Sequence, residues 1–181
     1  MNVRQRNLEK LRLMAIFAML GAIMFVSKLV MEFLPNVHLV GTLLVVYTVV
    51  YRAKALIPLY VFVLLAGLYG GFSLWWIPYL YVWTVLWGMV MLLPRRMKPQ
   101  IAIPVYVVTC SLHGFLFGTL YAPMQALLMG FDFDQMLAWI VAGFPFDVVH
   151  GVGNAVVGFL IYPLSRALMK MEARYQNRGV S

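Results

Sequence analysis

Basic residues and long apolar runs alternate along this sequence, and that alternation most constrains what the chain can fold into. Of its 14 Lys and Arg residues, all but Lys28 lie near the two ends or between apolar runs. They are Arg4, Arg6, Lys10, Arg12, Arg52, Lys54, Arg95, Arg96, Lys98, Arg166, Lys170, Arg174 and Arg178. Because membrane proteins keep Lys and Arg in cytoplasmic loops, the pattern predicts a membrane protein with these clusters on one side.

The composition supports the same interpretation. Hydrophobic residues make up 64% of the chain and charged residues 11%, whereas a soluble domain carries about 25% charged residues. The net charge of +8 does not indicate nucleic-acid binding, because the basic residues lie in short loops between apolar runs. We expect one transmembrane domain over residues 1–181, with a basic cytoplasmic N-terminus (1–10) and a basic cytoplasmic tail (170–181).

The apolar runs predict an all-α bundle of about six transmembrane helices with both termini in the cytoplasm. A spanning helix needs about 20 residues, so the second and third runs are short for this role. We expect the long last run to turn or kink near residues 143–145, where Gly and Pro occur. The predicted segments are 11–34, 38–51, 55–70, 73–93, 101–129 and 135–168.

Polar and aromatic residues in the early segments suggest a binding site, because polar groups inside spans are costly. Lys28 and Glu32 are four residues apart, so they share a helix face. They form either a neutralised pair at the membrane surface or contacts to a ligand. Trp76, Tyr79 and Trp83 share a face of the fourth segment and predict a stacking wall for a planar ligand, although an aromatic belt explains the outer tryptophan as well.

The fifth segment carries His113, Tyr121 and Gln125 at spacings that are multiples of four, and we expect them to contact a ligand. Gly114 and Gly118 lie on an adjacent face. This G-x-x-x-G step predicts close packing against another helix.

The sixth segment contains a carboxylate, an imidazole and an amide on one face. Asp147, His150 and Asn154 stand at i, i+3 and i+7, within about 60° of one another around a helix. Such a stripe must face the bundle interior. It is either a polar clamp on a solute or an interhelical hydrogen-bond network.

The sequence lacks the motifs of the common enzyme and metal sites. It contains no H-E-x-x-H, G-x-S-x-G or P-loop sequence, and its one Cys and three His show no clustered zinc spacing. We therefore expect no catalytic residues, no metal and no cofactor. Without a nucleotide-binding motif, we expect that the chain cannot use ATP by itself.

The chain resembles a family of membrane proteins in its layout. After a basic N-terminus, the chain has six short segments within 181 residues; the first contains an A-x-x-x-A step at Ala18 and Ala22, and ligand-like residues lie in the outer half. This resembles the substrate-binding S component of energy-coupling factor (ECF) vitamin transporters.

The resemblance implies a function and a set of partners. An S component captures a vitamin or similar micronutrient at the extracellular face of a prokaryotic cell membrane. It delivers the ligand together with a transmembrane T component and two cytoplasmic ATPases. The resemblance assigns Ala18 and Ala22 to docking of the T component. It carries over no ligand contact, because family members share a fold and not their ligand residues.

Other functions stay open at this point. The chain could be a self-sufficient secondary or proton-coupled carrier that uses Asp147 and His150, although carriers usually have inverted repeats and more spans. It could be a small intramembrane enzyme with the same two residues as acid–base groups. A structural assembly subunit is a further alternative.

Overall fold

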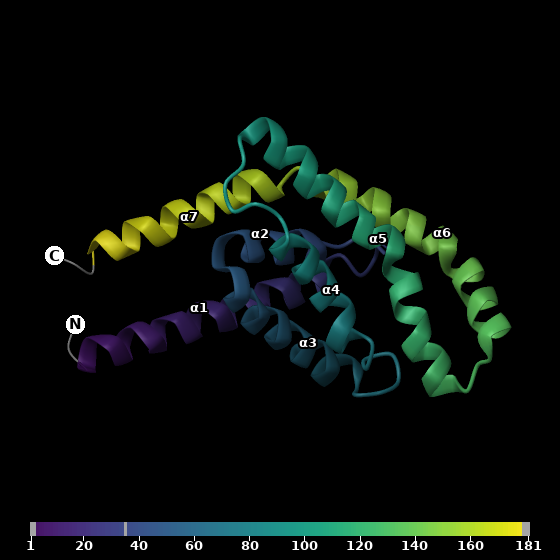
Figure 1. Cartoon of the computed structure of the whole chain (residues 1–181). Coiled ribbons are helices and arrows are strands. Elements are labelled where there is room, and N and C mark those ends of the chain that lie inside the picture. The colour runs from purple at the N-terminus through teal and green to yellow at the C-terminus, as the bar shows by residue number, and fades with distance from the viewer. Residues whose placement is uncertain (1–2, 35, 179–181) are drawn as a thin grey trace.

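In the computed structural model, which describes residues 3–34 and 36–178, every regular element is helical (Figure 1). This confirms the predicted all-α class. The helices are α1 (Val3–Val30), α2 (Val40–Tyr51), the 3₁₀ helix η1 (Arg52–Ala55), α3 (Leu56–Gly70), α4 (Tyr79–Met91), α5 (Pro99–Met129), α6 (Phe133–Gly158) and α7 (Ile161–Arg178).

Several of these helices are long and apolar enough to cross a membrane. The continuous helical stretches that meet this requirement are α1, Val40–Gly70, α5 and α6, while α4 is a shorter apolar helix. Many of their large apolar side chains are exposed, as lipid-facing side chains would be; Leu127 and Val141 are two examples. The structure is therefore consistent with a multi-pass membrane protein.

The stretch Val40–Gly70 is a hairpin and not one straight helix. Arg52 has φ 54° and ψ −124°, and the chain reverses direction between α2 and α3 (Figure 1). The Arg52 guanidinium donates to the carbonyl of Met91 at 2.7 Å, and Trp87 Nε1 donates to the Arg52 carbonyl at 3.2 Å. These bonds tie the turn to the end of α4, where cationic donors satisfy free helix carbonyls.

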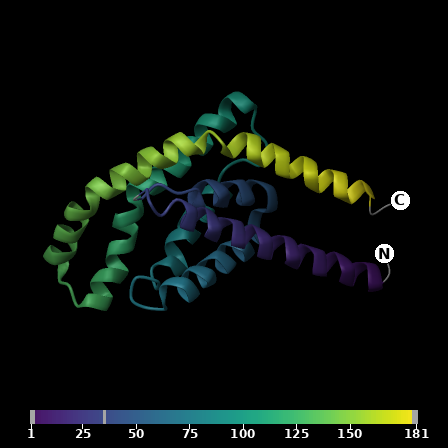
Figure 2. The same cartoon turned by 180° about the vertical axis from the view of Figure 1, so that it is seen from behind.

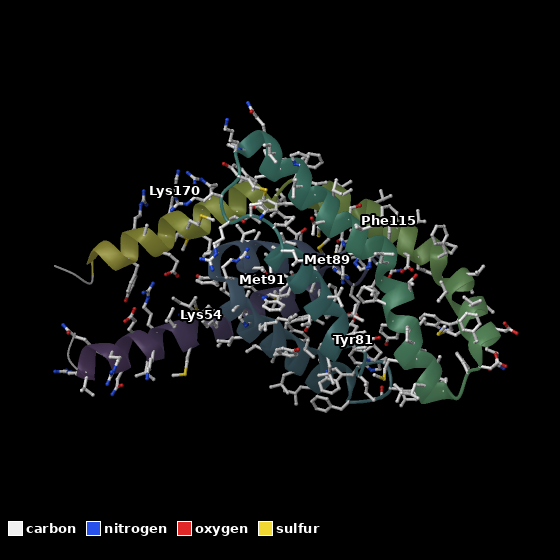
Figure 3. All side chains as sticks on the ribbon, viewed as in Figure 1. Lys54, Tyr81, Met89, Met91, Phe115 and Lys170 are labelled. Carbon is white, nitrogen blue, oxygen red and sulfur yellow. The ribbon has the colours of Figure 1, made fainter. Side chains whose placement is uncertain are left out.

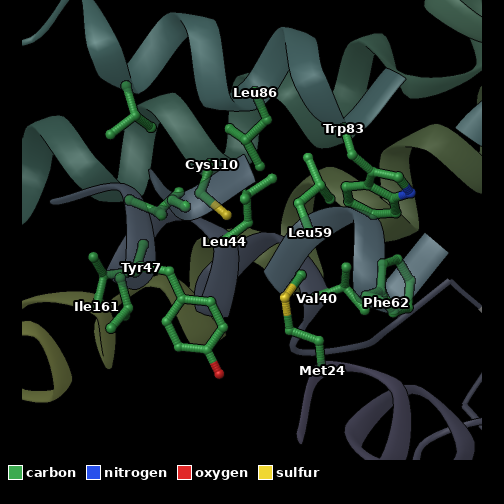
Figure 4. Close-up of a cluster of buried hydrophobic side chains, with 14 of the residues drawn as sticks. Met24, Val40, Leu44, Tyr47, Leu59, Phe62, Trp83, Leu86, Cys110 and Ile161 are labelled. Carbon is green, nitrogen blue, oxygen red and sulfur yellow. The ribbon is translucent and has the colours of Figure 1, made fainter. Parts of the chain in front are cut away.

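The buried core lies where α1, α2, α3 and α4 meet α5 and α7 (Figure 4). Met24, Leu44, Leu59 and Leu86 are completely buried in it. On α1, Gly21 allows α3 to approach so closely that a Cβ atom there would lie 2.8 Å from a backbone oxygen of α3. The predicted second and third segments are therefore stabilised by packing on their neighbours.

α5 and α6 lie side by side along most of their length (Figures 1 and 2). A Cβ atom at Gly114 would lie 2.8 Å from the Cα of Gly151. Ser111 Oγ also donates to the Gly151 carbonyl at 2.8 Å. The predicted packing of the G-x-x-x-G step against another helix is confirmed, and the partner is α6.

The sixth predicted segment, 135–168, is wrong at its end. α6 continues through Pro145 to Gly158, and Figure 1 shows it bent along its length. The break comes at residues 159–160, and α7 follows as a separate helix. Pro163 explains the position: it has no N–H to donate to the Phe159 carbonyl, but a proline is tolerated in the first turn of the next helix.

α7 and α1 run toward the two termini, which lie on the same side of the molecule (Figures 1 and 2). Arg12 and Glu172 join them by an ion pair of 3.2 Å. Tyr51 donates to the same carboxylate at 2.9 Å, and the Arg12 guanidinium lies 3.4 Å from the ring centroid of Tyr175. These contacts fix the ends of α1, α2 and α7 relative to one another.

The α5–α6 contact gives a matched pair of glycine substitutions. Gly114→Ala should lower the stability of the folded protein by about 1–3 kcal/mol, because the new methyl group meets backbone atoms that cannot move aside. Gly88→Ala on α4 meets nothing within 4 Å and should stabilise the helix by up to about 1 kcal/mol. Thermal unfolding in detergent would test this; equal melting temperatures for both variants would contradict the packing described.

Candidate functional site

A cavity of about 220 Å³ lies at the end of α1 that is distant from the N-terminus. Its walls come from α1, from the connection that follows it, and from single residues of α4, α5 and α6. The lining residues are Lys28, Met31, Glu32, Leu34, Asn36, Val37, His38, Tyr79, Phe117 and His150. Four predicted ligand contacts, Lys28, Glu32, Tyr79 and His150, are thus brought together.

Two histidines form the polar part of the cavity wall. The ring centroids of His38 and His150 are 4.9 Å apart, with the rings tilted by 69°. His150 is only 3% exposed, yet its Nε2 atom has no hydrogen-bond partner, and neither has Nδ1 of His38. Buried polar atoms are usually paired, so these nitrogens are free to bind a molecule in the cavity.

Aromatic rings form the adjoining wall and continue behind it. Phe117 lies against His150, with ring centroids 4.9 Å apart, and Trp83 packs behind Phe117 at 5.3 Å. Trp83 also contacts His38 at 5.7 Å. The predicted contact Trp83 therefore supports the rings that line the cavity and is not itself part of the lining.

His113 also lies behind the cavity wall. Its ring centroid is 5.6 Å from that of Trp83, and its Nε2 is 3.0 Å from the Val82 carbonyl. Because a carbonyl only accepts, Nε2 carries the proton of the neutral ring and Nδ1 is left as an acceptor. Nδ1 of His113 and Nε1 of Trp83 are both buried without a partner, which extends the set of unpaired ring nitrogens around the cavity.

Lys28 and Glu32 line the cavity as separate charges. The ion pair between Arg12 and Glu172 is the one present among the described residues, so the neutralised pair that the sequence allows is not formed. Lys28 is half-buried and Glu32 is exposed. Both charged groups are therefore free to contact a solute.

Asp147 and Asn154 lie between α5 and α6 and do not line the cavity. Asp147 Oδ1 accepts from the Gly118 backbone N–H at 2.9 Å, and Asn154 Nδ2 donates to the Cys110 carbonyl at 3.1 Å. Of the stripe on α6, only His150 faces the cavity. The other two residues make the interhelical hydrogen bonds that the sequence offers as the alternative to a ligand clamp.

The remaining predicted contacts also lie outside the cavity lining. Trp76 Nε1 donates to the Val63 carbonyl at 2.8 Å and so joins the turn before α4 to α3. Tyr121 donates to the Trp75 carbonyl and stacks on Trp139, with centroids 6.0 Å apart. Gln125, one turn further along α5, is half-buried. Trp76 and Tyr121 therefore join neighbouring segments of the bundle.

His38 and Phe117, together with the other lining residues of the connection after α1, were not predicted from the sequence. A usable signal was present, because the chain has three histidines and all of them join one aromatic cluster. Phe117 gave no signal of its own, since a single Phe in an apolar helix looks like a lipid-facing residue. Its role follows only from the way α5 packs against α6.

The structure also bears on two further points, metal binding and the exposure of the predicted docking residues. Among the residues described, no group of three or more His, Cys, Asp or Glu side chains is arranged to hold a metal ion. On α1, Ala18 is exposed and Ala22 is half-buried, whereas Gly21 between them packs on α3. Ala18 is therefore accessible from outside the bundle, and its role in docking stays a prediction.

Comparisons with protein-family models, with curated proteins and with solved structures found no match for this chain. The functional interpretation therefore rests on the cavity. It combines two unpaired imidazoles, two aromatic rings and two free charges of opposite sign, contributed by separate helices and a connection. Convergence of a few polar groups with aromatic walls is how small-molecule sites are built.

Substitutions at Asp147 test whether its contact with Gly118 has a structural role. Asp147→Ala removes the charged acceptor of the half-buried Gly118 N–H and should cost about 1–3 kcal/mol of stability. Asp147→Asn keeps an acceptor oxygen and should retain most of that stability. Melting temperatures of the two variants would check this, and an Asp147→Ala protein as stable as the wild type would show that the bond contributes little.

Proposed function

We propose that this protein is the solute-binding subunit of an ATP-driven importer, with the role of an ECF-type S component. The observation that carries the proposal is the cavity, where buried ring nitrogens are left without partners. An unpaired buried polar atom costs stability, so a protein with no ligand to bind has little reason to gather several of them. A bound solute would provide the missing partners.

The charge distribution supports a six-span topology for this subunit. The labelled residues Lys54 and Lys170 lie on the same side of the molecule as both termini (Figure 3). Under the positive-inside rule this side is cytoplasmic. The cavity lies at the opposite end of α1, so on this topology it faces the outside, where an imported solute is captured.

The cavity dimensions favour a small ring-bearing ligand. Drug-sized pockets are usually about 300–1,000 Å³, and this cavity is about 220 Å³. Tyr79 and Phe117 offer rings for stacking, and His38 and His150 offer hydrogen bonds. A vitamin or a micronutrient of similar size fits this combination.

The alternatives receive less support from the geometry. A proton-coupled carrier or an intramembrane enzyme would use Asp147 and His150 together, but Asp147 bonds to Gly118 and His150 faces the cavity. A binding subunit needs no such dyad. It needs a partner to supply energy, and Ala18 on the outer face of α1 offers a small-residue surface for a T component.

The proposed role separates binding from transport, and a bulky residue on α1 tests that separation. Ala18→Trp should abolish ATP-dependent uptake in cells that supply a T component and its ATPases, because the large side chain obstructs docking. It should leave solute binding by the purified protein within about 2-fold of the wild type, since Ala18 faces outward and lies about 15 Å along α1 from the lining residue Lys28. Ala142→Trp, at an exposed position of α6, is the matched control and should retain uptake.

Equal loss of binding and uptake in Ala18→Trp would contradict the docking role. Uptake by the protein alone in proteoliposomes without any ATPase would contradict the proposed function itself. Both measurements use the full chain with the solute that copurifies with it.

A further inference from the structure

We infer that the solute is a zwitterion: a ring with a polar group on its inner edge and a head that carries one positive and one negative charge. The inference rests on the proposed function and specifies the chemistry of the same site. Its basis is the pair of free, opposite charges at one end of the cavity and the pair of free imidazoles on its wall.

Lys28 and Glu32 lie close together in the chain without neutralising each other. Lys28 belongs to the last turn of α1, and the Glu32 backbone N–H bonds to the Leu29 carbonyl in the turn that follows. Both side chains line the cavity, and neither joins an ion pair. The two charges therefore face the same space and each lacks a counterpart.

Electrostatic complementarity then selects the charge of the ligand head. An anionic head alone would satisfy Lys28 and would be repelled by Glu32, while a cationic head alone would meet the opposite problem. A head with both charges satisfies both residues, and mismatched charges at a binding site are how proteins reject wrong partners. Lys28 should contribute more than Glu32, because it is half-buried and the carboxylate is exposed and screened by solvent.

The imidazole wall specifies the other end of the ligand. A neutral imidazole presents one N–H donor and one nitrogen acceptor, and His150 Nε2 and His38 Nδ1 have no partner in the protein. Phe117 lies against the His150 ring and offers an apolar face beside these nitrogens. A planar ring fits that face, and a hydroxyl or ring nitrogen on its edge can bond to the histidines.

A competing explanation is that Lys28 and Glu32 are only solvated at the membrane surface, as charged side chains near helix ends often are. In that case neither residue would affect which charged forms of a molecule bind. The two explanations therefore predict different orders of affinity for zwitterionic, cationic and anionic ligands, and not merely different affinities for one ligand.

Three molecules with one skeleton test the ranking: L-tyrosine, which is zwitterionic, tyramine, which is cationic, and 3-(4-hydroxyphenyl)propionate, which is anionic. Isothermal titration of the purified full-length protein in nanodiscs would measure each Kd. We expect tyrosine to bind at least about 10-fold more tightly than either analogue, which corresponds to about 1.4 kcal/mol. Every probe carries the same ring and hydroxyl, so the ranking reports the charged head.

Neutralising each residue should change the ranking in a defined direction. Lys28→Met should weaken tyrosine binding by about 10-fold and bring the preference toward tyramine. Glu32→Gln should shift the preference toward the propionate by a smaller factor, about 3-fold. Lys54→Met and Asp134→Asn remove exposed charges outside the cavity lining and should leave the ranking unchanged.

The zwitterion inference is overturned if either singly charged analogue binds as tightly as tyrosine. It is also overturned if all three bind more weakly than about 1 mM, or if Lys28→Met and Glu32→Gln keep the wild-type ranking. These outcomes leave the proposed function intact when another solute copurifies and is imported with a T component. Conversely, the protein could bind tyrosine tightly and also take it up without any ATPase. That result would overturn the proposed function but support the inference that the ligand is a zwitterion.

Discussion

Polar groups in an apolar environment must find their partners inside the protein, and the arrangement of this bundle depends on that requirement. The carboxylate of Asp147 satisfies a backbone N–H of α5. The amide of Asn154 satisfies a carbonyl of the same helix, and Arg52 satisfies a carbonyl at the end of α4. The bonds of Asp147 and Asn154 join α5 to α6, and the bond of Arg52 joins the turn after α2 to the end of α4, so these polar residues stabilise the contacts between helices.

The exceptions to this requirement mark the site. Among the described residues, Thr42, Arg52, Asn154 and Ser165 each leave one buried side-chain atom unpaired, and these four belong to different elements. The unpaired ring nitrogens of His38, Trp83, His113 and His150 instead belong to one aromatic cluster at the cavity. Of these residues, His38 and His150 line the cavity, so a polar solute bound there can supply the partners of their nitrogens, whereas Trp83 and His113 lie behind the wall.

The sequence was sufficient to predict the all-α class, the breaks at Arg52 and Gly130 and the close packing at Gly114, because each depends on local chemistry. It placed the end of the sixth segment wrongly, because the break at residues 159–160 ahead of Pro163 was not predicted, whereas α6 stays helical but bent through Pro145. In the site, Lys28, Glu32, Tyr79 and His150 were predictable as costly or aromatic residues. Whether Asp147 faces α5 or the cavity was not, because both arrangements put it on the same inward stripe.

The central claim is that the cavity at His150 holds a small solute. The most direct measurement is native mass spectrometry of the purified wild-type protein beside His150→Phe, which fills the space with an apolar ring and removes the unpaired nitrogen. We predict that the wild type carries a copurifying small molecule and that the variant, equally folded, loses it. An equal amount of the same molecule on both proteins, or none on the wild type, would contradict the account.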